Sequence, residues 1–399
     1  MRSVGLRRNI LYCALQGSYW MLYCISITFA SYFLLQNGYS NAEIGVILAL
    51  SYVAGMVLQP LLAAVADKKP RIGTPGILLL GIIACIACLL TLLVLRGHSI
   101  LLSAILVLFI GLSLGIQPLV NAFAFYLERL QTKISFGVAR GCGSGSYAVF
   151  AIIIGRLTLI WGAPMLPYAG LASALLLLTV TLVLRREGRP ADVISSAKKA
   201  RLTPAALRRS YGSFFALLLG TFGIFYGHSL VSNFLMQIVE NVGGNSSDLG
   251  TISSYTALLE IPAMLLFDRL ERRISCTTML KFAAVFFTAK AFLLAFASSV
   301  PMLYLVFLTQ LFSFAVFIPA SVRYVDRIMP PELSNTAQAL ITLMVTSSST
   351  ISSALGGFMI DGIGMRTTLL IGGAGTLLGT VAVFCGMRQP KRVKLRKTE

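Results

Sequence analysis

Four ionisable side chains fall inside long apolar runs of this sequence: Arg140, Arg156, Glu260 and Lys290. A charge surrounded by hydrocarbon is costly unless it is paired or hydrated, so such residues point to function. If the runs are helices, Glu260 and Lys290 lie about 12 to 13 Å inside the same end of successive helices. They could form a charge pair that only locks two helices together. Alternatively, the carboxyl binds and releases protons under the influence of the nearby ammonium group.

A second pattern is the pair Arg140 and Tyr147. Seven residues separate them, so both lie on one face of a helix, two turns apart. A guanidinium can hydrogen-bond two hydroxyls at once, and an aromatic ring can cover the apolar face of a pyranose, so the pair suits a sugar. It suits a carboxylate on an aromatic body equally well. A third interpretation assigns Arg140 to a cytoplasmic charge cluster with Glu128 and Asp67.

The first apolar run and one histidine add further polar candidates. The run carries a polar and aromatic face at spacings of three and four, formed by Gln16, Tyr19, Trp20, Tyr23 and Ser26. We expect this face to line a cavity; the alternative is an aromatic belt at a membrane interface. His228 is the one histidine inside an apolar run, and it suits either a proton relay or a helix–helix hydrogen bond.

Other motifs predict structure rather than chemistry. Gly137, Gly141 and Gly145 repeat at four-residue spacing, which favours close helix packing. The glycine-rich stretch lacks the Lys-Ser/Thr of a phosphate-binding loop, so we expect no nucleotide. No set of paired acids, metal ligands or activated nucleophile is apparent, so we expect no enzyme activity, no metal and no cofactor. Asp361 is expected to be a helix-end group.

Composition indicates the elements that must position these residues. Of the 399 residues, 57% are hydrophobic and 12% are charged, and the mean hydropathy is +0.84. A soluble domain carries roughly 25% charged residues, so this chain is not a cytosolic enzyme, a nucleic-acid binder or a secreted disulfide scaffold. The basic residues behind the net charge of +19 gather in alternate loops. Because cytoplasmic loops are enriched in Lys and Arg, both termini and the central loop are expected in the cytoplasm.

Apolar runs of about 20 residues predict twelve membrane-spanning helices. They lie near 11–36, 45–66, 74–95, 99–127, 137–160, 164–184, 211–239, 249–267, 277–298, 301–325, 334–360 and 367–387. One long polar interruption divides them six and six. The chain is thus expected to comprise an N-terminal six-helix bundle, a basic cytoplasmic linker, a C-terminal six-helix bundle and a basic cytoplasmic tail, at 1–184, 185–210, 211–387 and 388–399.

The two halves are related as copies. Three short motifs recur about 200 residues later: Asn41–Gly45 as Ser246–Gly250, Asp67-Lys68 as Asp268-Arg269, and Tyr126–Arg129 as Tyr324–Arg327. Because six spans separate the copies, both halves have the same orientation in the membrane. Parallel repeats of this kind occur in secondary transporters, whose substrate site lies between the halves.

Two six-helix halves, a basic central loop and an acidic–basic motif after spans 2 and 8 together resemble the major facilitator superfamily. The stretch from Asp67 to Arg71 is a degenerate copy of that superfamily's loop motif, and the stretch from Asp268 to Arg273 keeps the charges better. The resemblance implies an all-α membrane protein with the major facilitator fold. It also implies a conformational gate on the cytoplasmic side, formed by Asp67, Lys68, Glu128, Arg129, Asp268, Arg269, Asp326 and Arg327.

Part of the chain resembles the lactose-permease-like oligosaccharide/proton symporters. The segment Phe136–Tyr147 is similar to the fifth helix of that branch, and Leu259–Pro262 is similar to the acidic position of its eighth helix. The resemblance implies that Arg140 and Tyr147 contact sugar. It also implies that Glu260 takes part in proton coupling, with Lys290 near the ninth-helix Arg of the branch.

The sequence departs from that branch in two places. Asn121 stands where the branch has a sugar-binding Glu, and the tenth-helix Lys, His and Glu positions fall near Thr309, Phe312 and Ala315. The Glu-Ile-Pro of span 8 also resembles phenylpropionate-permease-like proteins.

These observations predict a multi-pass protein of a bacterial plasma membrane that moves a sugar, an oligosaccharide or a nucleoside-like solute together with protons. Carriage of aromatic or other organic acids is the first alternative, and drug/proton export is the second. The expected partners are the solute, protons and lipid, with no nucleic acid and no nucleotide, and the expected state is a monomer.

Overall fold

The computed structural model describes residues 2–68, 73–130, 133–187 and 212–387. Eleven helical segments in this part of the chain are long and apolar enough to cross a membrane. The helix α11 (Ser246–Glu271) is a twelfth, 26 residues long, and its polar and charged residues, Glu260 among them, make it less apolar. The expectation of twelve spanning helices is confirmed. The linker beyond residue 187 and the tail 388–399 lie outside the described residues.

The N-terminal half contains the first six spans. They are α1 with the π-helical segment η1 and α2 (Arg2–Tyr23, Cys24–Thr28 and Ala30–Gln36), α3 (Asn41–Lys68), α4 (Gly73–Val94), α5 (Ile100–Glu128), α6 (Phe136–Trp161), and the short η2 (Ala163–Met165) followed by α7 (Leu166–Arg186).

The C-terminal half contains the other six. They are α9 with α10 (Gly212–Asn233 and Leu235–Asn241), α11, α12 (Cys276–Leu294), α13 with the 3₁₀ segment η3 and α14 (Val300–Phe307, Leu308–Leu311 and Phe314–Ile328), α15 (Pro331–Ile363) and α16 (Met365–Gly386).

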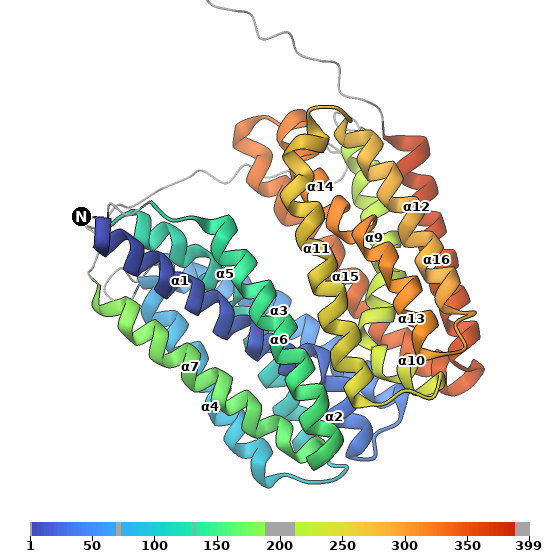
Figure 1. Cartoon of the computed structure of the whole chain (residues 1–399), viewed down its shortest axis with the longest axis horizontal. Coiled ribbons are helices and arrows are strands. Elements are labelled where there is room, and N and C mark those ends of the chain that lie inside the picture. Colours follow the sequence, from blue (N-terminus) through green and yellow to red (C-terminus); the bar gives the residue numbers. More distant parts are fainter. Residues whose placement is uncertain (1, 69–72, 131–132, 188–211, 388–399) are drawn as a thin grey trace, which may run out of the picture.

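The packing of the helices repeats from one half to the other. In the N-terminal half α1 packs on α6 and α7, α3 on α5, and α4 on α5 and α7. The equivalent pairs in the C-terminal half are α9 on α15 and α16, α11 on α14, and α12 on α14 and α16. Across the interface, α3 packs along α15 and α11 packs along α6. In both contacts, the second span of one half packs on the fifth span of the other half. Figure 1 shows the two bundles side by side.

The first helix of each half is interrupted at an equivalent depth. In the N-terminal half the helix passes through η1 to Phe29, and in the C-terminal half it breaks at Phe234 before α10. Both phenylalanines have non-helical backbone angles, with φ of −95° and −112°. Like the starts of α3 and α11, they lie about 200 residues apart, so the repeat extends to local irregularities of the backbone.

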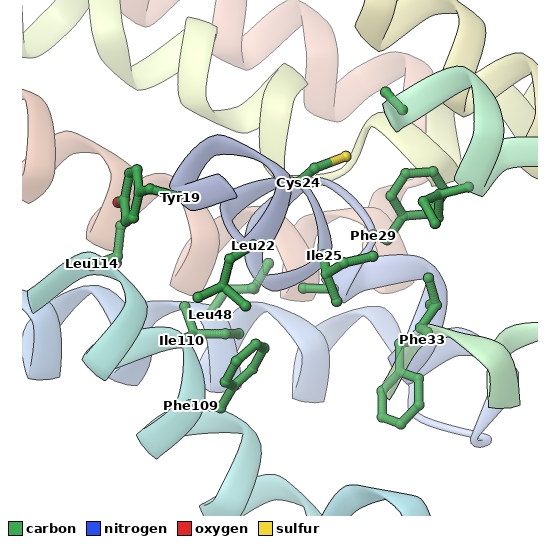
Figure 2. Packing of buried hydrophobic residues seen from close by; sticks show 14 of the residues in the cluster. Tyr19, Leu22, Cys24, Ile25, Phe29, Phe33, Leu48, Phe109, Ile110 and Leu114 are labelled. Atoms are coloured by element: carbon green, nitrogen blue, oxygen red, sulfur yellow. The ribbon is translucent and has the colours of Figure 1, made fainter. Parts of the chain in front are cut away.

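One apolar core joins the two halves at one end of the molecule. Figure 2 shows part of it, where Leu22 of the first span lies beside Leu48 of α3 and Ile110 of α5. The same buried cluster continues into the C-terminal half through residues such as Phe234, Val239 and Leu303. A second cluster, between Phe214 and Met387, belongs to the C-terminal half alone.

We call the end where α1 begins and α5, α11 and α16 end the terminal face, and the other end the opposite face. At the opposite face the halves touch through glycines. A Cβ added to Gly45 of α3 would meet the backbone of Gly357 in α15 at 3.2 Å, and one added to Gly250 of α11 would meet that of Gly155 in α6 at 2.9 Å. Figure 1 shows the bundles diverging from there toward the terminal face.

The glycine stripe on α6 follows this divergence. Gly137 and Gly141 lie on the same face of the helix as Gly155, nearer the terminal face. A Cβ at Gly137, Gly141 or Gly145 would meet nothing within 4 Å, so the predicted close packing is wrong in this conformation. The reason is that α11 has already separated from α6 at this depth.

Asp361 joins the halves as well. From the end of α15, its carboxylate accepts hydrogen bonds from the Asn41 side chain at 2.8 Å and from the Ala42 backbone N–H at 2.7 Å. It therefore caps the first turn of α3 from the other half. A local reciprocal capping box is present at the start of both equivalent helices, Ser40 with Glu43 before α3 and Asn245 with Asp248 at α11, so the Asp361 cap is additional to the local one.

Candidate functional site

A chain of hydrogen bonds links α9, α11, α12 and η3 in the C-terminal half. We call the side of each half that carries its candidate site residues the wall of that half: α1, α5 and α6 in the N-terminal half, and α9, α11, α12 and η3 in the C-terminal half. The ammonium of Lys290 donates to the side-chain oxygen of Gln310 at 2.8 Å, and the amide nitrogen of Gln310 donates to a carboxylate oxygen of Glu260 at 3.1 Å. Lys290 also donates to Nδ1 of His228 at 3.1 Å. The three residues predicted for proton coupling thus belong to one network, with Gln310 at its centre.

Glu260 and Lys290 do not form a direct ion pair within 4 Å among the described residues; Gln310 lies between them. Lys290 is 1% exposed and Gln310 is 5% exposed, so bulk water screens neither the charge of Lys290 nor the amide dipole of Gln310. Because a protonated amine only donates, its partner Nδ1 must accept, which places the proton of neutral His228 on Nε2. The ring of His228 lies among Phe225, Phe287 and Phe314.

Gln310 reaches this position because its span is broken. The helix α13 gives way to η3 at Leu308–Leu311, and α14 starts only at Phe314. Irregular backbone at membrane depth is tolerated where it is buried in protein or lines a cavity. Here η3 packs against both α11 and α12, which carry Glu260 and Lys290. Nothing in the local sequence pattern distinguishes Gln310 from the other neutral polar residues in the spans.

The wall of the N-terminal half carries Arg140. Its guanidinium carbon lies 4.0 Å from the ring centroid of Trp20, and its Nη1 donates to Ser144 at 2.7 Å. Gly143 makes this stack possible, since a Cβ there would lie 2.5 Å from the indole ring. Arg140 is therefore held on the α1–α6 wall rather than among the charges at the terminal face. The indole Nε1 of Trp20 is buried without a partner among the described residues.

Gln16 and Asn121 form a second polar group on this side. The amide nitrogen of Gln16 donates to the Tyr12 hydroxyl at 2.9 Å and to the Asn121 side-chain oxygen at 3.2 Å. The side-chain oxygen of Gln16 is buried and unpartnered in the described part of the chain. Asn121 is half-buried on α5, so the two predicted residues meet at the α1–α5 contact.

The predicted aromatic residues separate into two groups: Tyr19 and Tyr23 pack around Trp20, whereas Tyr147 contacts the π-helical segment of the first span. Tyr19 is fully buried, donates to the backbone of Ser113 in α5 at 3.2 Å, and supports Trp20 edge-on. Tyr23 is half-buried beside Trp20, with ring centroids 4.9 Å apart. Tyr147 shares a hydrogen bond of 2.8 Å with Thr28, in the π-helical segment of the first span. π-helical turns are frequent at functional sites. The sequence pattern does not identify Thr28 as a partner of Tyr147.

Ionisable groups of the two walls interact across the interface. The Glu260 carboxylate interacts electrostatically with Arg140 of the N-terminal half and with Lys290 of its own half. Tyr23 interacts electrostatically with both Arg140 and Glu260. Arg140, Tyr23 and Glu260 therefore lie within electrostatic range of one another. Arg156, the fourth ionisable residue inside the apolar runs, is exposed near the end of α6 and is not part of this group.

The predicted gate residues lie at the terminal ends of four helices. Glu128 and Arg129 are exposed at the end of α5, and Arg269 is exposed on α11. Asp326 accepts a hydrogen bond from Ser334, and Arg327 pairs with Glu271 at 2.7 Å. The side chains of Asp67, Lys68 and Asp268 lie outside the described residues. Whether the set acts as a gate stays a prediction.

The class of protein follows from these features. Two repeated six-helix bundles touch at one face, diverge toward the other, and present ionisable groups to each other across the interface. This is the architecture of a secondary transporter, with a site between the repeats.

The chain matches the model of the MFS_1 like family over residues 12–371 and belongs to that family. It is a multi-pass membrane protein that transports a solute, and it is not an enzyme.

Curated relatives are similar over most of their length. The maltose permease of Geobacillus stearothermophilus is 26% identical over 353 residues, covering 86% of each chain. The probable 3-phenylpropionic acid transporter of Escherichia coli (strain K12) is 24% identical over 358 residues, covering 87% of this chain and 90% of the relative.

Solved structures share the fold. A crystal structure of a single-substitution mutant of the nucleoside transporter NupG has a TM-score of 0.80 at 16% identity and covers 96% of this chain and 100% of its own. An auto-inhibited POT family peptide transporter has a TM-score of 0.76 at 10% identity, covering 95% of each chain.

Proposed function

We propose that this protein is a proton-coupled symporter that moves a sugar, an oligosaccharide or a nucleoside-like solute across the membrane by alternating access. The observation that carries the proposal is the interaction between Glu260 and Arg140 across the two halves. A half-buried carboxyl that faces the other half can exchange a proton when the halves rearrange, because its charged neighbour on that half then changes. Lys290 and His228 complete the proton-coupling group.

The N-terminal wall supplies groups for a polar solute. Arg140 uses one of its five N–H donors on Ser144, Trp20 has an unpartnered indole N–H, and Gln16 has an unpartnered acceptor. Hydroxyl groups both donate and accept, so they can satisfy such a mixture. We assign solute contact to Arg140, Tyr147, Asn121, Gln16, Tyr19, Trp20 and Tyr23. The names of the maltose permease and of the nucleoside transporter support this solute class.

The proposal includes the topology. Residues 1–184 and 211–387 form the two moving bundles, 185–210 the cytoplasmic linker and 388–399 the cytoplasmic tail. Lys and Arg concentrate in loops at the terminal face, so that face is assigned to the cytoplasm of a bacterial plasma membrane. The working unit is a monomer, because each half finds its helix partners within the same chain.

An aromatic carboxylate is the second candidate solute. Arg140 stacked on Trp20 could bind the carboxylate with its remaining donors, while Trp20 and Tyr23 cover the ring. The relative named as a probable 3-phenylpropionic acid transporter supports this class.

Thermal unfolding of the detergent-purified protein, measured against a panel of sugars, nucleosides and aromatic acids, tests the proposal. A ligand at 100 times its dissociation constant adds about 2.7 kcal/mol of stability, which raises the melting temperature measurably. Shifts with one sugar or nucleoside class identify the solute for proton-uptake assays in liposomes. Shifts with aromatic acids alone replace the first solute class by the second, and uptake without proton movement refutes the symport mechanism.

A further inference from the structure

The side chain of Gln310 occupies the place where a direct ion pair would otherwise form. Lys290 and Glu260 come from neighbouring helices of one half, and both are in contact with the same amide. The polarity of that amide is fixed, because the ammonium can only donate and so must face the carbonyl oxygen. The nitrogen of Gln310 therefore faces the carboxyl group and donates to it.

We propose that Gln310 is a positioning residue that holds the Lys290 ammonium one amide away from the Glu260 carboxyl, so that the carboxyl stays able to exchange its proton. This inference rests on the proposed proton symport. The flexible lysine stem would otherwise let the ammonium reach the carboxylate directly. A direct contact pair of opposite charges favours the ionised carboxylate and holds it in that form.

The surroundings of Glu260 support this role. The ionisable groups that interact with its carboxyl are Arg140 of α6, Tyr23 of α1 and Lys290 of α12. Arg140 belongs to the other half, so its influence changes when the halves move. Lys290 belongs to the same half and would stay in place through the cycle. Holding Lys290 back with Gln310 leaves Arg140 as the variable neighbour, which ties proton exchange to the movement of the halves.

The break in the span gives the amide its place. The backbone at Leu308–Leu311 is 3₁₀ rather than α-helical and packs between α11 and α12. In a regular helix, the direction of the side chain of residue 310 would be fixed by the helical repeat of about 3.6 residues per turn. The irregular segment instead positions Gln310 between Lys290 and Glu260.

Two substitutions separate spacing from hydrogen bonding. Gln310→Ala removes the spacer and both hydrogen bonds, so Lys290 can reach Glu260. Gln310→Met keeps the length of the side chain but removes the hydrogen bonds, including the one that stabilises the ionised carboxyl. The proton-exchange midpoint of Glu260 should move to more acid pH in Gln310→Ala, by about one to three pH units, and slightly to more alkaline pH in Gln310→Met.

The measurement is an infrared pH titration of the purified protein, which needs no transported solute. The carboxyl band of Glu260 is identified by its loss in Glu260→Gln. Adding Lys290→Met to Gln310→Ala should abolish the acid shift, because the ammonium that causes it is gone. Equal midpoints in the wild type, Gln310→Ala and Gln310→Met overturn the inference about Gln310. A wild-type Glu260 band that never titrates refutes proton symport itself, which is a different result.

Discussion

The two halves share a plan of helix contacts, but their walls at the interface differ in chemistry. The N-terminal wall presents one cation, Arg140, stacked on an aromatic side chain, with neutral amides nearby. The C-terminal wall carries the Glu260 carboxyl, which Gln310 joins to the buried amine of Lys290; that amine donates directly to the imidazole of His228. Repetition therefore supplies the framework. Under the proposed function, the difference between the two sides assigns solute recognition to the N-terminal half and proton exchange to the C-terminal half.

The largest expected effect comes from neutralising the C-terminal wall. Glu260→Gln removes the one carboxyl in the network, so proton-driven accumulation of solute should be abolished. Exchange of solute down its own gradient should continue, because the N-terminal wall is intact. Uptake and counterflow in liposomes with an imposed pH gradient measure both. Glu240→Gln, at an exposed glutamate of α10, is the matched control. Undiminished accumulation by Glu260→Gln would make this carboxyl structural.

A smaller effect is expected on the N-terminal wall. Arg140→Lys keeps the charge but replaces a planar fork of donors with a point charge. Solute affinity should fall about tenfold or more, equivalent to about 1.4 kcal/mol, while proton coupling persists. Ligand-induced melting shifts measure the affinity. Arg156→Lys on the same helix provides the control, since Arg156 is exposed and is not part of the group formed by Arg140, Tyr23 and Glu260. If Arg140→Lys lost coupling and kept its affinity, the assignment of roles to the walls would be reversed.

The smallest effect concerns how the equivalent helices α3 and α11 begin. Asp361→Ala removes a cap that comes from the other half, so contact at the opposite face should weaken by about 1 kcal/mol, a roughly fivefold change in the ratio of conformers. Distances between spin labels at the terminal ends of α5 and α14 report that ratio. Asn245→Ala removes a local cap and should lower the melting temperature without changing the distances. Identical responses from the two variants would remove this distinction between the halves.

Most of the fold and part of the site could be predicted from the sequence. Apolar runs, basic loops and the internal repeat indicate the helices, because each depends on residues close together in the chain or on a fixed spacing. Glu260, Lys290 and Arg140 are conspicuous because each is a charge in an apolar run. Gln310 is not conspicuous, because its role depends on a helix break and on side chains from two other helices.

Two further features show the same limit. The stripe at Gly137, Gly141 and Gly145 has the spacing of a packed helix face, yet whether a neighbouring helix reaches it depends on the conformation of the two halves. Asp361 looks like an ordinary helix end, and its partner is the start of a helix some 320 residues earlier. Contacts between the halves are set by their relative position, which no local pattern encodes.

The glycine contacts at the opposite face have a pharmacological consequence. At Gly250 and Gly155 the two backbones touch with no room for a methyl group. A bulky residue at Gly250 would act as a wedge that favours the carrier form open on that face. A blocker applied from that face would then reach a site between the halves, whereas in the conformation described here the glycine contacts close that side. The sidedness of inhibition can thus be tuned far from any residue that touches the drug.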